Sequence, residues 1–227
     1  MGNLNTSISS VLFPAFARYQ DDYSKLKESL RNSIRVSSYI LSPFLVGMAA
    51  TAKPLITVLL TEKWLPCVPF LQMVCFYQLL IPVSSANLQV IKSTGRGSVL
   101  LKLEILKRVV GVLILVVTMQ INVFAIAIGA AVSTAFNSIV DALANRKIIR
   151  YSLIEQTKDF FGSISISLIM GLCIYPLQFL ISLSWVLLLV QVALGGIVFI
   201  GLSYFTKNDN FLYLLNVLKG LLKRDKQ

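Results

Sequence analysis

The distribution of basic residues limits what this chain can fold into more than any other feature of its sequence. Long apolar runs alternate with short polar connections, and 19 of the 21 Lys and Arg residues lie on every second connection. Only Lys53 and Lys63 lie on the other set. A chain that crosses a membrane repeatedly shows this pattern, because Lys and Arg are retained in its cytoplasmic loops. The 19 residues are Arg18, Lys25, Lys27, Arg31, Arg35, Lys92, Arg96, Lys102, Lys107, Arg108, Arg146, Lys147, Arg150, Lys158, Lys207, Lys219, Lys223, Arg224 and Lys226.

The composition agrees with a membrane protein and excludes several other classes. Hydrophobic residues make up 56% of the 227 positions and charged residues 14%, whereas about 25% of a soluble domain is charged. The net charge of +11 does not indicate nucleic-acid binding, because the cations flank apolar runs and form no groove with interleaved aromatic residues. The chain has no histidine, which excludes Ser-His-Asp catalysis, HExxH zinc chemistry and haem ligation. We therefore predict no enzymatic activity, no metal and no cofactor.

Six segments are long and apolar enough to cross a bilayer, for which a helix needs roughly 20 residues. We expect the fold to be an all-α polytopic bundle of about six transmembrane helices. If the first helix starts in the cytoplasm, 19 of the 21 cations face inward and both termini are cytoplasmic, in what we expect to be the inner membrane. The segments are approximately Ile34–Leu60, Val68–Ile91, Val99–Met119, Val123–Val140, Phe160–Leu183 and Trp185–Phe205.

The two ends of the chain differ from the central residues 34–206. Ile8 to Ala17 is apolar but only about half a span long, like the end of a preceding membrane helix. It is followed, up to residue 33, by a basic amphipathic segment that we expect to lie on the cytoplasmic membrane surface. Leu26 and Leu30 share a helical face there with the adjoining Ile34. Residues 207–227 form a second basic amphipathic segment, which we expect to rest on membrane lipids. We interpret the chain as part of something larger.

The fourth segment carries a stripe of small and polar residues at every fourth position, which are Ala125, Gly129, Ser133, Asn137 and Asp141. Polar groups in hydrocarbon usually face a bundle interior or an aqueous cavity, and small residues allow helices to approach closely. Two interpretations remain open: a packing seam that opens into a polar cavity near Asn137 and Asp141, or packing alone with Asp141 at the lipid headgroups.

The second and third segments also carry polar residues. Gln78, Ser85 and Gln89 line one face of the second segment, where they either line a cavity or bond neighbouring helices. The third begins with Lys102, Glu104, Lys107 and Arg108, and its glutamate is spaced to pair with either of the last two. These cations either snorkel to the cytoplasmic surface or form a cationic mouth for an anionic headgroup such as a pyrophosphate.

Several short motifs occur between residue 8 and about residue 206. They are Phe13-Pro14-Ala15-Phe16-Ala17-Arg18 with Gln20-Asp21-Asp22, Glu62-Lys63-Trp64 with Pro69-Phe70-Leu71-Gln72, and Lys102-Leu103-Glu104 with Lys107-Arg108. With these motifs the chain resembles the bacterial polysaccharide flippases, which export lipid-linked oligosaccharides and belong to the multidrug/oligosaccharidyl-lipid/polysaccharide superfamily. Ala17 and Thr61 depart from the pattern, since the family often has Ser and Gly there.

The resemblance implies a fold of two six-helix lobes around a central cavity plus two extra helices, of which this chain would hold the end of helix eight and helices nine to fourteen. It implies movement of polyprenyl-pyrophosphate-linked sugar repeats by alternating access, with a separately encoded N-terminal lobe as a partner. Lys102, Lys107 and Arg108 would attract the pyrophosphate, and Gln78, Ser85, Gln89, Ser133, Asn137 and Asp141 would line the cavity. The alternatives are a drug or ion antiporter of the same superfamily and a non-transporting scaffold or remnant.

Overall fold

The structure is a computed structural model that describes residues 12–20, 22–181, 183–206 and 210. Within these ranges the regular elements are helices, and the predicted all-α class is confirmed. A short helical segment over residues 12–17 precedes the labelled elements. These are α2 (Tyr23–Ala50), α3 (Ala52–Leu60), the 3-10 helix η1 (Glu62–Cys67), α4 (Val68–Gln78), α5 (Ile81–Ser93), α6 (Gly97–Met119), α7 (Val123–Ile149), α8 (Leu153–Ile174), the 3-10 helix η2 (Tyr175–Phe179) and α9 (Ser184–Phe205).

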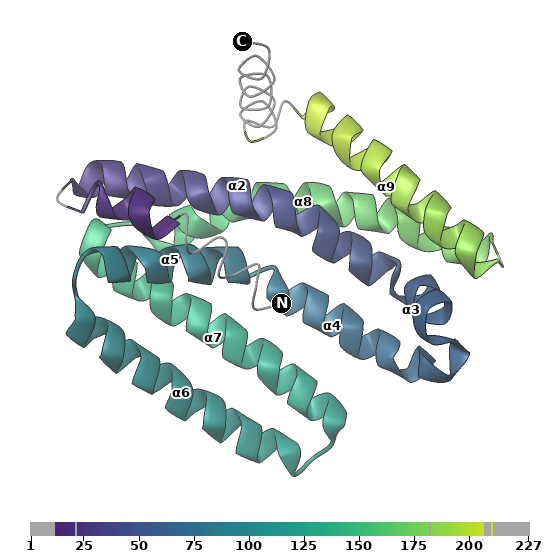
Figure 1. The fold of residues 1–227 in the computed structure, drawn as a ribbon, viewed down its shortest axis with the longest axis horizontal. Helices are drawn as coiled ribbons and strands as arrows, with labels where there is room; N and C mark the ends of the chain where they lie inside the picture. Colours follow the sequence, from purple (N-terminus) through teal and green to yellow (C-terminus); the bar gives the residue numbers. More distant parts are fainter. Residues whose placement is uncertain (1–11, 21, 182, 207–209, 211–227) are drawn as a thin grey trace.

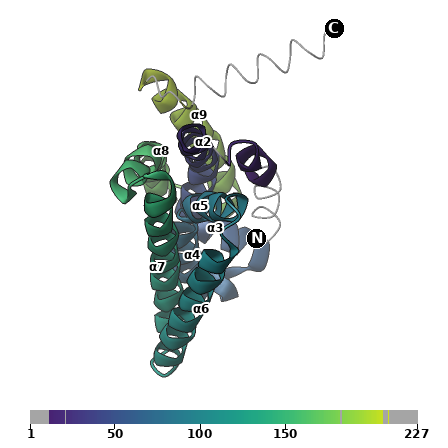
Figure 2. The ribbon, with the colours of Figure 1, turned by 90° about the vertical axis from the view of Figure 1, so that its left-hand side faces the viewer.

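The helices run back and forth between two ends of an elongated bundle. The start of α2 and the α5–α6 and α7–α8 connections lie at one end, whereas α3, η1, the α6–α7 turn and η2 lie at the other (Figure 1). The α6–α7 hairpin forms one side, α2, α8 and α9 the other, and α5 lies between them (Figure 2). The first end carries the connections rich in Lys and Arg, and the second carries Lys53 and Lys63.

Five helical stretches of the described chain are long and apolar enough to cross a membrane: Tyr23–Ala50, Glu62–Ser93, Val123–Ile149, Leu153–Phe179 and Ser184–Phe205. The sixth expected span corresponds to α6, which has 23 residues and carries four charged side chains in its first half. It packs against α7, to which a three-residue turn joins it. The chain is therefore a multi-pass membrane bundle, as the sequence predicts.

The first predicted span, Ile34–Leu60, differs from the helices that form. α2 begins eleven residues earlier at Tyr23 and ends at Ala50, and α3 follows after Thr51. Pro54 explains the break, because it has no N–H to bond the carbonyl of residue 50 and is tolerated in the first turn of a new helix. The predicted division at residues 33 and 34 thus falls inside one continuous helix.

Two other proline residues interrupt predicted spans. The segment Val68–Ile91 is divided into α4 and α5 at Leu79 and Leu80, just before Pro82, which removes a helical hydrogen bond. The segment Phe160–Leu183 instead starts at Leu153, where Ser152 and Glu155 form a reciprocal capping box. Its α-helix ends before Pro176, and η2 follows.

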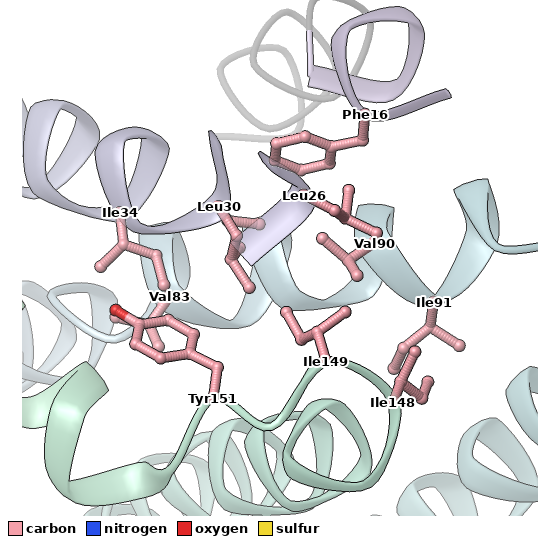
Figure 3. Packing of buried hydrophobic residues seen from close by; sticks show 11 residues of the cluster. Phe16, Leu26, Leu30, Ile34, Val83, Val90, Ile91, Ile148, Ile149 and Tyr151 are labelled. Carbon is pink, nitrogen blue, oxygen red and sulfur yellow. The ribbon is translucent and has the colours of Figure 1, made fainter. Parts of the chain in front are cut away.

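Leu26, Leu30 and Ile34 share one helical face as expected, but this face is fully buried in the bundle. Figure 3 shows the three side chains directed toward Val83 and Val90 of α5 and toward Ile149 and Tyr151 at the end of α7. The prediction of a surface amphipathic segment here is therefore wrong: α5 and α7 cover the apolar face, so it does not contact lipid. Asp22 caps α2 as its sequence position suggests, and its side chain accepts a hydrogen bond from the Lys25 N–H, which lowers the pKa of Asp22. The predicted C-terminal segment 207–227 lies outside the described residues, except for Asn210.

Candidate functional site

A polar cavity of about 280 Å³ lies between α6 and α7. Glu104, Lys107, Arg108, Gly111, Val112 and Leu115 of α6 and Ser133 and Asn137 of α7 line it. Two cations, one carboxylate, a hydroxyl and an amide therefore converge on one space. Such convergence of polar groups is what distinguishes a binding cavity from a packing defect.

Lys107 is the most buried ionised group among the lining residues, with 8% of its surface exposed. Its Nζ donates to Asp141 Oδ1 at 2.9 Å and forms an ion pair with Glu104 at 2.5 Å. Asp141 is fully buried, and its other oxygen accepts a hydrogen bond from Ser84 Oγ at 2.8 Å. One lysine thus joins α6 to α7, and the carboxylate continues the connection to α5.

The α7 stripe explains how the cavity forms. Toward the α6–α7 turn the two helices are very close, because a Cβ added at Gly129 would approach Thr118 Cγ2 within 2.9 Å. One turn further along, a Cβ at Gly111 would lie 3.4 Å from Ser133 Oγ, which is ordinary contact. The cavity begins beside this looser contact, where Ser133 and Asn137 line it. Within the described chain, Asn137 Oδ1 is buried without a hydrogen-bond partner.

The structure brings together four of the nine residues proposed from the sequence: Lys107, Arg108, Ser133 and Asn137. Asp141 lies next to them but not among the described lining, because Lys107 separates it from the cavity. Lys102 is exposed on α6. Gln78 lies on α4, and Ser85 and Gln89 lie on α5; the described lining of this cavity includes none of the three.

The cavity lies well inside the bundle. Lys107 is ten residues beyond the start of α6, which is about 15 Å at 1.5 Å per residue. Asp141 is eight residues before the end of α7, or about 12 Å from the same end. The ion pair therefore lies about 12–15 Å along the two helices from the end of the bundle that carries most Lys and Arg.

A second charged cluster, which the sequence analysis missed, joins α2 to α8. Asp159, whose side chain is 2% exposed, pairs with Arg31 at 2.7 Å and with Arg35 at 2.5 Å. Tyr151 donates to the same carboxylate at 2.7 Å. Burial and this hydrogen bond raise the pKa of Tyr151, so it remains a protonated donor. We call Arg31, Arg35, Tyr151 and Asp159 the Asp159 cluster.

A neutral network lies beside that cluster and connects α5, α7 and α8. Asn87 donates to Gln156 at 2.7 Å, and Asn145 donates to Asn87 Oδ1 at the same distance. The sequence held a signal for Asn145, because it continues the every-fourth series one step beyond Asp141. Asn87 shows that α5 uses polar groups to bond neighbouring helices.

A larger cavity of about 660 Å³ lies between α2, α3, α8 and α9 and is lined mainly by apolar side chains. Gln191 is its most buried polar residue, and it donates to the carbonyl of Ile174 at 2.9 Å. This cavity carries no charge among its described lining residues. Across the described ranges, no three His, Cys, Asp or Glu side chains are grouped to hold a metal ion.

Comparison with known proteins supports the resemblance found in the sequence. Residues 1–69 match the family described as polysaccharide biosynthesis protein. The chain is 25% identical over 220 residues to an uncharacterised membrane protein in the cps region of Klebsiella pneumoniae, covering 96% of this chain and 44% of that one. It is 32% identical over 104 residues to the lipopolysaccharide biosynthesis protein WzxC of Escherichia coli strain K12, covering 46% of this chain and 21% of WzxC.

Two further comparisons extend the resemblance. The teichuronic acid biosynthesis protein TuaB of Bacillus subtilis strain 168 is 25% identical over 191 residues, covering 80% of this chain and 37% of TuaB. Among solved structures, the lipid II flippase MurJ in an inward closed conformation matches with a TM-score of 0.69 at 18% identity, covering 91% of this chain and 44% of MurJ. The chain thus spans less than half the length of these relatives. It is a multi-pass membrane protein that is similar to polysaccharide biosynthesis proteins over part of their length, and its fold matches part of the MurJ structure.

Proposed function

We propose that this chain is the C-terminal part of a flippase that moves polyprenyl-pyrophosphate-linked oligosaccharide repeats across the cytoplasmic membrane. The observation that carries the proposal is the polar cavity between α6 and α7, whose lining brings together Lys107, Arg108, Ser133 and Asn137. The relatives' names, lipopolysaccharide biosynthesis protein, teichuronic acid biosynthesis protein and lipid II flippase, support the same class of cargo.

The lining residues suit the anionic headgroup of such a lipid. Arg108 offers a planar guanidinium fork that matches phosphate oxygens, and Lys107 offers a compact ammonium beside it. Ser133 and Asn137 would bond the phosphate or the first sugar. Away from bulk water these interactions gain strength. Lys102, exposed five residues nearer the start of α6, would attract the headgroup toward the cavity.

The cycle requires more than this chain alone provides. Its relatives are more than twice as long, so we propose that an N-terminal lobe supplies the opposite wall of the central cavity. Rocking of the two lobes would expose the α6–α7 cavity to each side in turn. We assign the end of the bundle that carries most Lys and Arg to the cytoplasm, in accordance with the positive-inside rule.

The alternative transport function is antiport of small cations. The cavity lining disfavours it, because two cations and one carboxylate face the space. Glu104 and Asp141 neutralise Lys107, but Arg108 is effectively always charged and would repel a cationic cargo.

Export of surface polysaccharide provides the test. In cells that depend on this protein for export, neutralising Lys107 and Arg108 together with Gln should lower surface polysaccharide at least tenfold. The matched control is Lys53→Gln with Lys63→Gln, which removes the same charge at the opposite end of the bundle. That variant should export normally. If the first variant exports polysaccharide at the wild-type level, with equal protein in the membrane, the assignment of this cavity to the anionic headgroup is wrong.

A further inference from the structure

The two carboxylates that contact Lys107 differ in their surroundings. Asp141 has 1% of its side chain exposed and is also bonded by Ser84 of α5. Glu104 has 35% exposed and reaches Lys107 from one turn away on the same helix. Asp141 is therefore fixed by two neighbouring helices, whereas Glu104 can turn outward without breaking a contact between helices.

We propose that Glu104 is a built-in counter-ion that holds Lys107 while the cavity is empty and is displaced by the anionic diphosphate of the cargo, whereas Asp141 positions Lys107 in both states. This inference deepens the proposed function and rests on it. The exchange is reciprocal: the diphosphate replaces one carboxylate on the ammonium, and Glu104 regains its hydration.

Charge balance supports the exchange. Glu104, Lys107 and Asp141 together carry one negative charge, and Arg108 brings the cavity to neutral. A neutral cavity attracts an anion weakly. Once Glu104 turns away, Lys107 and Arg108 face the cavity against Asp141 alone, so the net charge becomes +1. The cost of releasing Glu104 is small because partly exposed ion pairs contribute little stability.

The arrangement also predicts selectivity for highly charged ligands. An incoming anion must compete with a carboxylate that is already tethered beside the lysine, at high effective concentration. A diphosphate carries more charge than a monophosphate and can contact Lys107 and Arg108 together. Glu104 would therefore exclude singly phosphorylated lipids more strongly than diphosphorylated ones.

The test measures affinities of the full chain in lipid nanodiscs for farnesyl diphosphate, farnesyl monophosphate and farnesol. Glu104→Gln should bind the diphosphate about fivefold more tightly and should discriminate less against the monophosphate. Asp141→Asn should bind it about tenfold more weakly, because Lys107 loses its fixed partner. General repulsion by carboxylates would instead strengthen binding in both variants.

Glu155→Gln is the matched control. Glu155 also pairs with a lysine, Lys27, at 3.0 Å, but outside the cavity, and Gln preserves its capping box. This variant should bind as the wild type does. Thermal unfolding of every variant checks the fold, and Glu104→Ala replaces Glu104→Gln if the latter does not fold.

The outcomes separate the two proposals. If the wild type binds the diphosphate more tightly than farnesol but Glu104→Gln shows no gain, the counter-ion assignment is overturned and the proposed function stands. If the wild type binds farnesol as tightly as farnesyl diphosphate, both are overturned. Opposite shifts in the two carboxylate variants support both.

Discussion

The Asp159 cluster and the Lys107–Asp141 pair both neutralise a buried carboxylate, but they differ in their donors and in their surroundings. Each buries a carboxylate that a cation on a neighbouring helix neutralises. Asp159 pairs with two guanidinium groups and accepts a hydrogen bond from a tyrosine hydroxyl. None of these four residues is among the described lining of the α6–α7 cavity. Asp141 receives one ammonium and one hydroxyl, and that ammonium lines the cavity.

The comparison shows what turns a buried ion pair into a candidate binding site. In the Asp159 cluster the donors are directed to one acceptor, so it acts as a clamp between α2 and α8. At the cavity, Lys107 borders open space, Arg108 is exposed, and Asn137 has an unpaired buried oxygen in the described chain. A bound ligand can form the hydrogen bonds and ion pairs that these groups still have available. In this protein a buried ion pair is therefore a candidate binding site only where it borders a cavity, as Lys107 does and the Asp159 cluster does not.

The largest expected effect comes from breaking the clamp. Asp159→Asn removes the carboxylate that Arg31, Arg35 and Tyr151 share. It should lower the free energy of unfolding by about 2–3 kcal/mol, because hydrogen bonds to a charged group contribute more stability than neutral ones. Titration with sodium dodecyl sulfate measures this loss. Folded Asp159→Asn protein should bind farnesyl diphosphate with the same affinity as the wild type. Weaker binding without a loss of stability would mean that the clamp belongs to the site.

Packing along the α2–α8 contact gives the next effect. A Cβ at Gly171 would approach Val46 Cγ1 within 2.7 Å, whereas one at Gly162 of the same helix would meet nothing within 4 Å. Gly171→Ala should destabilise the bundle by about 1–2 kcal/mol, and Gly162→Ala should not. Equal unfolding temperatures for the two variants would show that this contact is not closely packed.

The smallest expected effect lies outside both regions. Thr61 has φ +80° and ψ 166°, a conformation that essentially only glycine adopts and that costs a β-branched residue about 1–3 kcal/mol. The family that the chain resembles often has Gly at this position, because glycine adopts this backbone conformation without strain. Thr61→Gly should raise the free energy of unfolding by about 1 kcal/mol and leave farnesyl diphosphate binding unchanged. A lower unfolding temperature would contradict this account of the turn.

Much of the fold could be predicted because membrane insertion leaves a strong pattern in sequence. The apolar lengths and the alternation of cations predict six spans in order, and five of them correspond to described helical stretches that are long and apolar enough to cross a membrane. The ends of the helices could not be predicted as well. Whether Pro54, Pro82 or Pro43 would end a helix depends on neighbours, and Pro43 remains inside α2.

The candidate site was partly predictable for a similar reason. The every-fourth spacing on α7 and the cluster of cations on α6 each predict a polar face. Which faces meet depends on tertiary packing. The second and fourth segments carry similar polar faces, but only Asn137, and none of Gln78, Ser85 and Gln89, is among the described lining residues of the α6–α7 cavity. Ser84 and Asp159 carried no periodic signal and emerged only from the structure.

Protection of one engineered cysteine tests the central claim most directly. With Cys67, Cys75 and Cys173 replaced by Ala, Ser133→Cys would place a single thiol on the wall of the α6–α7 cavity. We predict that farnesyl diphosphate blocks its reaction with a water-soluble maleimide and that farnesol does not. Labelling at the same rate with and without farnesyl diphosphate would contradict the assignment of this cavity to the diphosphate headgroup.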